Sequence, residues 1–125
     1  MTIADWTIAA AVFLTYIVML PAKLDPSFDN RDPRACHAAQ KGLRRRAYSA
    51  HLNGFEALVF FIPAVLLAEF RGAPQGFVDA AALVFVVARA AYGACYLANL
   101  GAARSVAWAV GFLSACAIFV SPLWS

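Results

Sequence analysis

The sequence predicts an all-α integral membrane protein built as a bundle of four transmembrane helices. Of its 125 residues, 63% are hydrophobic and 14% are charged, and the mean hydropathy is +0.71. Soluble domains are only about 45–50% apolar. Four segments also approach the length of about 20 residues that crosses a hydrocarbon core, namely 3–20, 47–70, 77–100 and 103–123. Because they fill most of the chain, we expect a single transmembrane domain over residues 1–125.

The first segment, 3–20, is predicted to be a retained span. It could be mistaken for a secretory signal, but it has no basic region at its start and carries Asp5 ahead of Trp6. The sequence Pro-Ala-Lys follows it in place of a small-residue cleavage site. We therefore expect this segment to stay in the membrane and to end at Pro21.

The loop after the first segment is predicted to be irregular and then helical. It contains three prolines, which break regular structure in its front half. Asp32 followed by Pro33 forms a helix start, because the aspartate can cap free backbone N–H groups and proline suits the first helical position. The second helix is therefore expected to begin before the membrane, with a bend or interruption near Gly42.

The same loop carries most of the positive charge and predicts the orientation of the chain. Its basic residues are Lys23, Arg31, Arg34, Lys41, Arg44, Arg45 and Arg46. The loop between the second and third segments has Arg71 beside two acidic residues, and the last loop has Arg104. The positive-inside rule places the first and third loops in the cytoplasm and both termini outside. A membrane-flanking cluster accounts for these charges, so we predict no nucleic-acid partner.

The remaining connections are short, and the cysteines form no motif. Residues 71–76, RGAPQG, contain two glycines and a proline, which indicates a tight turn to an antiparallel helix. The third segment is rich in alanine and glycine, which favours close helix packing in a bilayer. Cys36, Cys95 and Cys116 are scattered without metal-ligand spacing, so we predict no metal site.

Polar residues that a membrane should exclude recur at helical spacing in the second segment. Steps of three or four place Arg46, Ser49, Asn53, Glu56 and Phe60 on one stripe. His51 lies two residues from Asn53 and is expected to point elsewhere, toward a neighbouring helix or subunit. The stripe therefore predicts a polar face that continues from the cytoplasmic end into the membrane.

The third segment carries a second polar stripe, formed by Arg89, Tyr92 and Tyr96. An ionisable group at the centre of a bilayer costs about 2.5–3.5 kcal/mol on insertion scales, so such groups face a bundle interior or a water-filled cavity. One interpretation is structural, with Glu56 and Arg89 forming an internal ion pair. The other is a ligand site, and the two interpretations are compatible.

Arg104 and Ser105 open the fourth segment, where free backbone N–H groups and the helix dipole favour an anion. The alternative for Arg104 alone is an arginine that extends to the membrane surface. Together with the two stripes, the pair predicts a site for a small ligand with more than one carboxylate and an amine. Arginines would bind the carboxylates and Glu56 the amine. Glutathione has these groups, although other peptides share them.

Three motifs resemble the MAPEG family, the membrane-associated proteins in eicosanoid and glutathione metabolism. The first is R-A-x-x-A-H-x-N-x-x-E over residues 46–56, and the second is R-x-x-Y-x-x-x-Y over residues 89–96. The third is the pair Arg104 and Ser105, and the order and spacing of the motifs cover nearly the whole chain. The resemblance is to a general member of bacterial type, which implies the inner membrane of a bacterium.

The resemblance implies a homotrimer with glutathione sites between adjacent subunits near the cytoplasmic surface. It implies a glutathione-binding set of Arg46, His51, Asn53, Glu56, Arg89, Tyr92 and Tyr96. Arg104 is similar to the arginine that activates the thiol, and Ser105 to its neighbouring hydroxyl.

The chain departs from the eicosanoid enzymes of the family at several positions. Ser49 and Leu52 stand where some of those enzymes have arginines, and Phe60 stands where a proline often follows the glutamate. Arg44 or Arg45 could supply the missing charge. These departures favour a general detoxifying enzyme over an eicosanoid enzyme.

The function implied is a glutathione-dependent transferase or peroxidase that acts on hydrophobic electrophiles from the bilayer. Two alternatives stay open. One is a family member that has no catalysis. The other is a small four-helix proton-coupled transporter that uses Glu56, although such transporters usually have a weak lysine and arginine bias and a glutamate in the first helix.

Overall fold

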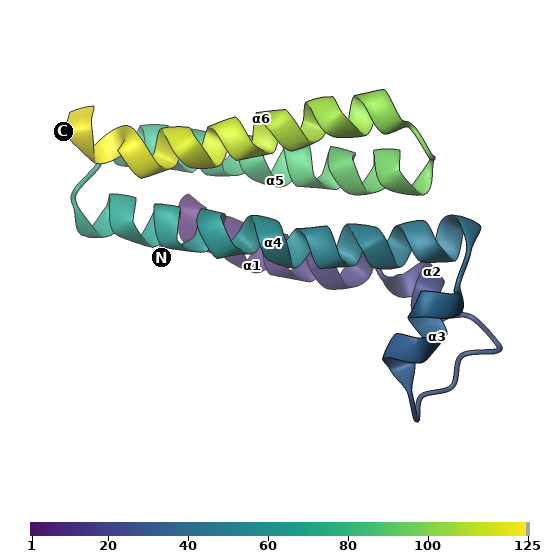
Figure 1. The fold of residues 1–125 in the computed structure, drawn as a ribbon. Coiled ribbons are helices and arrows are strands. Elements are labelled where there is room, and N and C mark those ends of the chain that lie inside the picture. Colours follow the sequence, from purple (N-terminus) through teal and green to yellow (C-terminus); the bar gives the residue numbers. More distant parts are fainter. Residues whose placement is uncertain (125) are drawn as a thin grey trace.

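Four long helices lie side by side and form the body of the molecule (Figure 1). The structure, a computed structural model, describes residues 1–124. Its α-helices are α1 Ile3–Ile17, α2 Leu20–Lys23, α3 Pro33–Ala39, α4 Gly42–Phe70, α5 Gln75–Leu97 and α6 Gly101–Val120, and the 3-10 helix η1 covers Ser121–Trp124. Helices α1, α4, α5 and α6 run alternately in opposite directions, and α3 projects from one end of the bundle.

Four helical stretches are long and apolar enough to cross a membrane, with mean hydropathies of 1.6 to 2.0. They are Ile3–Lys23, Gly42–Phe70, Gln75–Leu97 and Gly101–Trp124. The prediction of an all-α chain with four apolar helices is therefore confirmed, and the chain is a multi-pass membrane protein. The second stretch begins earlier than the predicted segment because the helix continues past the bilayer-length run to Gly42.

The first stretch is divided where proline removes a backbone donor. Pro21 has no N–H group, so the carbonyl of Ile17 cannot accept the usual bond from four residues ahead. Helix α1 ends at Ile17, and the Met19 N–H donates to the Tyr16 carbonyl at 3.2 Å instead of continuing the α-helical pattern. The break leaves the Thr15 carbonyl, which would otherwise have accepted from Met19, open to another donor.

The predicted helix start at Asp32 and Pro33 is confirmed. The Asp32 carboxylate accepts a bond from the Ala35 N–H at 3.3 Å and caps α3. The interruption near Gly42 is also present, because α3 ends at Ala39 and α4 begins at Gly42 with a φ of +63°. Glycine adopts this left-handed conformation without steric cost. The turn lets α3 leave the bundle axis.

Apolar side chains in the middle of the bundle hold the four helices together. The rings of Phe61 on α4 and Phe85 on α5 stack with centroids 3.8 Å apart and planes 2° apart. Val65, Val78 and Ile118 are fully buried around them, so α4, α5 and α6 share one core. The polar residues Asn53 and Glu56 on α4 and Arg89 on α5 lie nearer than this core to the end that carries α3.

Candidate functional site

Four predicted site residues form a continuous series along α5 and the start of α6. The Arg89 guanidinium lies over the Tyr92 ring at 4.2 Å, and the Arg104 guanidinium lies over the Tyr96 ring at 4.3 Å. The two tyrosine rings meet edge to face at 5.7 Å. Spacings of three and four residues place the α5 members on one helix face. The turn before α6 then brings Arg104 back over that face.

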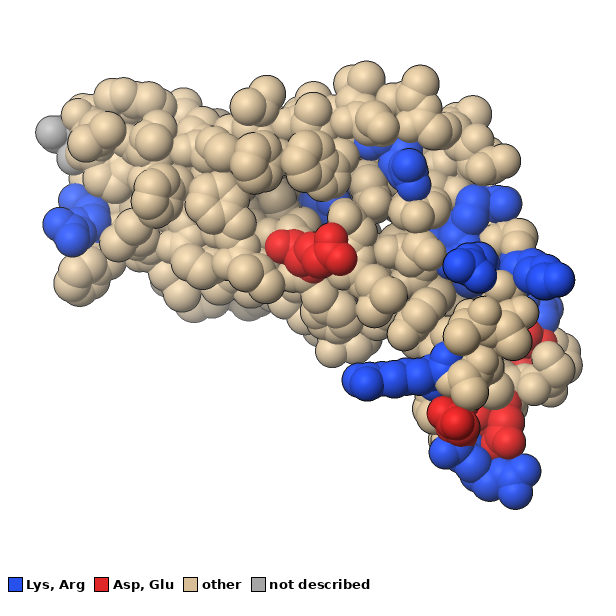
Figure 2. Space-filling model, viewed as in Figure 1, with Lys and Arg blue, Asp and Glu red and all other residues tan. Residues whose placement is uncertain are grey.

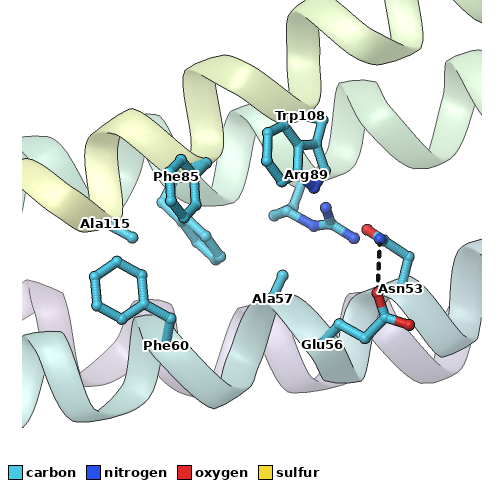
Figure 3. A pocket seen from close by; sticks show the side chains of 9 residues that line it. Asn53, Glu56, Ala57, Phe60, Phe85, Arg89, Trp108 and Ala115 are labelled. Atoms are coloured by element: carbon cyan, nitrogen blue, oxygen red, sulfur yellow. Dashed lines mark hydrogen bonds between the residues drawn. The ribbon is translucent and has the colours of Figure 1, made fainter.

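Asn53 and Glu56 on α4 lie across the bundle from Arg89. Figure 3 shows the Arg89 guanidinium pointing toward the Asn53 amide. The Asn53 Nδ2 group donates to Glu56 Oε2 at 3.3 Å. These three polar residues line one end of a cavity of about 160 Å³ between α4, α5 and α6.

The ion pair that one interpretation of the sequence placed between Glu56 and Arg89 is absent from residues 1–124. The salt bridges in this part of the chain join Arg31 to Asp29 and Arg44 to Asp25. Arg89 rests on the Tyr92 ring instead, and Glu56 bonds to Asn53. The cavity therefore contains a half-buried cation and an anion that do not neutralise each other by direct contact.

Two polar atoms of the predicted set are buried without a hydrogen-bond partner among the described residues. They are the Nε of Arg46 and the Oδ1 of Asn53. Another nitrogen of Arg46, Nη2, donates to the Leu97 carbonyl at 3.3 Å, so this side chain reaches the end of α5. A buried polar atom without a partner costs about 1–3 kcal/mol. Both atoms are therefore positioned to gain from a bound polar ligand, the Nε as a donor and the Oδ1 as an acceptor.

Arg104 lies at the end of the bundle, at a separate small hollow of about 90 Å³, and Ser105 follows it on α6 outside the lining. Tyr96, Asn99 and Arg104 contribute to its wall. Ser105 is exposed, and its hydroxyl donates to the Gly101 carbonyl at 3.2 Å. The serine oxygen can still accept a bond in this conformation, but its proton is directed back to the helix.

Sequence reasoning missed most of the aromatic wall of the cavity. Phe60 belonged to the predicted stripe, and Phe85, Trp108 and Phe112 line the cavity with it. Phe60 and Phe85 lie at the apolar end, and Trp108 lies beside Arg89 (Figure 3). The Trp108 and Phe112 rings are stacked at 5.1 Å, with planes 8° apart. A signal was present, because Arg104, Trp108 and Phe112 follow one another at intervals of four and share one face of α6.

His51 lies apart from the other predicted site residues. The residue is 7% exposed, and its Nδ1 is 2.6 Å from the Thr15 carbonyl oxygen of α1. A carbonyl can only accept, so Nδ1 carries the proton in this contact. His51 therefore donates a hydrogen bond to the Thr15 carbonyl, which the break after Ile17 leaves without a backbone donor. In agreement with the prediction, it points to a neighbouring helix.

We expect His51→Ala to lower the free energy of unfolding by about 1–3 kcal/mol, because the buried Thr15 carbonyl would lose its partner. Unfolding in detergent, followed by circular dichroism, measures the change. His51→Asn, which keeps a side-chain N–H donor, should recover part of it. Equal losses in both variants would show that ring packing, and not the hydrogen bond, carries the effect.

The arginines expected to replace the missing charge at Ser49 are placed differently. Arg44 pairs with Asp25 at 2.5 Å, and Arg45 is exposed. Leu52 is 44% exposed and Ser49 is half-buried. The described cavity is therefore built around Arg89, with Arg46 and Arg104 nearer the end of the bundle.

Comparison with known proteins gives one result. The MAPEG family profile matches residues 3–124. No curated protein and no solved structure matches the chain. The match covers all four apolar helices and every residue of the site described above. The chain therefore belongs to the MAPEG family.

Proposed function

We propose that the protein is a glutathione-dependent transferase or peroxidase that acts on hydrophobic electrophiles. The observation that carries the proposal is the pair of buried, unpartnered polar atoms, Arg46 Nε and Asn53 Oδ1. Asn53 lines the cavity together with Arg89 and Glu56, and Arg46 lies two turns before it on the same stripe of α4. Such a group suits a ligand that has both carboxylates and N–H groups. Many MAPEG members use glutathione, which has this combination.

The polar residues would divide the binding of glutathione between them. Arg46 and Arg89 would bind carboxylates through charge-assisted hydrogen bonds, and Glu56 would accept from the amine. Asn53 Oδ1 would accept from an N–H of the ligand, and the edges of Tyr92 and Tyr96 would fix its position beside Arg104. Bound glutathione supplies a thiol as the nucleophile. Arg104 would stabilise the thiolate, with Ser105 and the first turn of α6 adding hydrogen-bonding groups.

The apolar end of the cavity supports a hydrophobic second substrate. Phe60 and Phe85 lie at this end, which continues from Arg89 and Trp108 toward the middle of the bundle. Phe112 also lines the cavity. Moving a hydrophobic substrate from the bilayer into this apolar cavity would cost little free energy, because both surroundings are apolar. The residues would hold it beside the activated thiol, which lowers the entropy cost of the reaction.

We further propose a homotrimer with the site between subunits and with both termini outside the cytoplasm of a bacterial cell. Glu56 is exposed although it lies inside an apolar membrane-spanning helix. A carboxylate facing lipid is costly, which favours a neighbouring subunit over that surface. The basic residues near α2 and α3 support a cytoplasmic location for that end of the bundle.

Glutathione binding to the purified protein tests the proposal. Thermal unfolding is measured with glutathione and with S-methylglutathione, which keeps the carboxylates and the amine. We expect both to raise the melting temperature. Arg46→Gln or Asn53→Leu should weaken binding by about 10–100-fold, because each removes a hydrogen bond to a charged or buried group.

Arg71→Gln is the matched control, because Arg71 lies at the other end of α4 and should leave binding unchanged. Conjugation of 1-chloro-2,4-dinitrobenzene and reduction of cumene hydroperoxide then measure turnover. Failure of the wild-type protein to bind either ligand would overturn the proposal. Binding without turnover would assign the protein to the non-catalytic alternative.

A further inference from the structure

Charge is distributed unequally between the two ends of the bundle. Figure 2 shows Lys and Arg atoms gathered at the end that carries residues 23–41, which include α3 and which we call the arm, with far fewer at the opposite end. The arm and the adjoining start of α4 contain seven basic residues and three acidic ones, over residues 23–46. The opposite end has Arg71 close in sequence to Glu69 and Asp79.

The three carboxylates of the arm are all engaged within the arm or with α4. Asp25 accepts from Ser27 and from Arg44, and the Ser27 hydroxyl, as the main cause, holds the pKa of Asp25 well below its ordinary value. Asp29 pairs with Arg31 at 3.1 Å. Asp32 caps α3. These contacts neutralise Arg31 and Arg44 and leave the other cations of the arm without carboxylate partners.

Within residues 23–46, four exposed cations remain without an ion pair, and we name them the basic rim: Lys23, Arg34, Lys41 and Arg45. Lys23 ends the first apolar stretch, and Lys41 immediately precedes the second. These two lysines therefore lie where the spans leave the hydrocarbon core, with Arg45 in the first turn of α4 and Arg34 on the projecting α3.

Exposed leucines accompany these cations. Leu20 is 48% exposed and Leu24 is 73% exposed on either side of Lys23, and Leu43 is 46% exposed beside Lys41. Apolar side chains interleaved with cations are suited to a membrane interface, where the leucines enter the acyl region and the cations remain among the head groups.

We propose that the basic rim binds the phosphate groups of anionic phospholipids. Basic clusters beside a transmembrane helix attract anionic lipid by about 1 kcal/mol per residue, which is roughly fivefold in affinity. The rim meets this requirement with four unpaired charges at the membrane surface, and the end that contains Arg71 does not. The site is separate from the cavity, and the proposal does not depend on glutathione activity.

The test compares phosphatidylglycerol with phosphatidylcholine on the full chain in detergent. Each lipid is added to the purified protein, and the shift in melting temperature gives an apparent affinity. We expect phosphatidylglycerol to bind at least about tenfold more tightly than phosphatidylcholine in 0.1 M salt. The preference should disappear near 1 M salt, where screening shortens the range of charge interactions to about 3 Å.

The variant Lys23→Gln/Arg34→Gln/Lys41→Gln/Arg45→Gln should lose the preference, and Arg71→Gln should keep it. Circular dichroism checks that the quadruple variant is folded, and the salt dependence of the wild type tests the proposal without any variant. Equal binding of the two lipids by the wild type would overturn the proposal. So would complete displacement of phosphatidylglycerol by an equal concentration of inorganic phosphate, or an equal stabilisation by a short RNA, since either would assign the rim to a soluble anion.

Discussion

Arg104→Ala is expected to lower the turnover number for glutathione conjugation by about 10²–10³-fold, the usual effect of removing one preorganised group that stabilises an anion. Arg104 lies over the Tyr96 ring at 4.3 Å, which holds the guanidinium at the start of α6. Its charge would act on the developing thiolate more than on the carboxylates of the ligand. The effect should therefore appear in turnover with saturating glutathione, and the melting-temperature shift caused by S-methylglutathione should change little.

Two further variants separate this role from a general loss of positive charge. Arg104→Lys keeps the charge but loses the planar group that rests on Tyr96, so we expect partial activity. Arg71→Ala removes an arginine from the far end of α4 and should retain full activity. The ultraviolet absorbance of bound thiolate provides a direct readout. If Arg104→Ala keeps both the thiolate signal and the turnover number, another group activates the thiol.

The four helices could be predicted from the sequence because a bilayer imposes strong requirements. Each span needs a long apolar run, and the runs around 77–100 and 103–123 are interrupted only by short connections. The start of α3 was also predictable from the sequence, because Asp32 caps the helix and Pro33 occupies its first position, and neither role depends on a distant residue. The first helix was expected to end at Pro21, but α1 ends at Ile17, because Pro21 lacks the N–H that the Ile17 carbonyl would accept. The Thr15 carbonyl is then bonded by His51 of another helix, a contact that local sequence does not predict.

The arrangement of the candidate site was predictable within one helix but not between helices. Helical spacing predicted that Arg89, Tyr92 and Tyr96 share a face, and their contacts follow from it. Spacing does not predict which partner a long side chain selects across a bundle. Arg89 could reach either Glu56 or a tyrosine ring, and it rests on Tyr92, its neighbour three residues away.

Packing between α1 and α4 depends on a glycine that the sequence alone does not distinguish. A Cβ atom on Gly54 would lie 2.7 Å from both Oγ1 and Cγ2 of Thr15. Threonine in a helix has few alternative rotamers, and its hydroxyl already donates to the Ala11 carbonyl at 2.9 Å. Small residues permit such close approach between membrane helices. Gly54 therefore allows α4 to lie close to α1 beside the candidate site residue Asn53.

Gly54→Ala is accordingly expected to destabilise the protein by about 1–3 kcal/mol, because steric overlap exceeds the gain in helix propensity. Unfolding by SDS titration measures the change. Gly76→Ala is the matched control, since a Cβ there meets nothing within 4 Å, and it should be neutral or slightly stabilising. In the background of Thr15→Ala, which removes both overlapping atoms, Gly54→Ala should cost at least about 1 kcal/mol less. Additive effects of the two substitutions would mean that the contact between α1 and α4 is not what requires glycine.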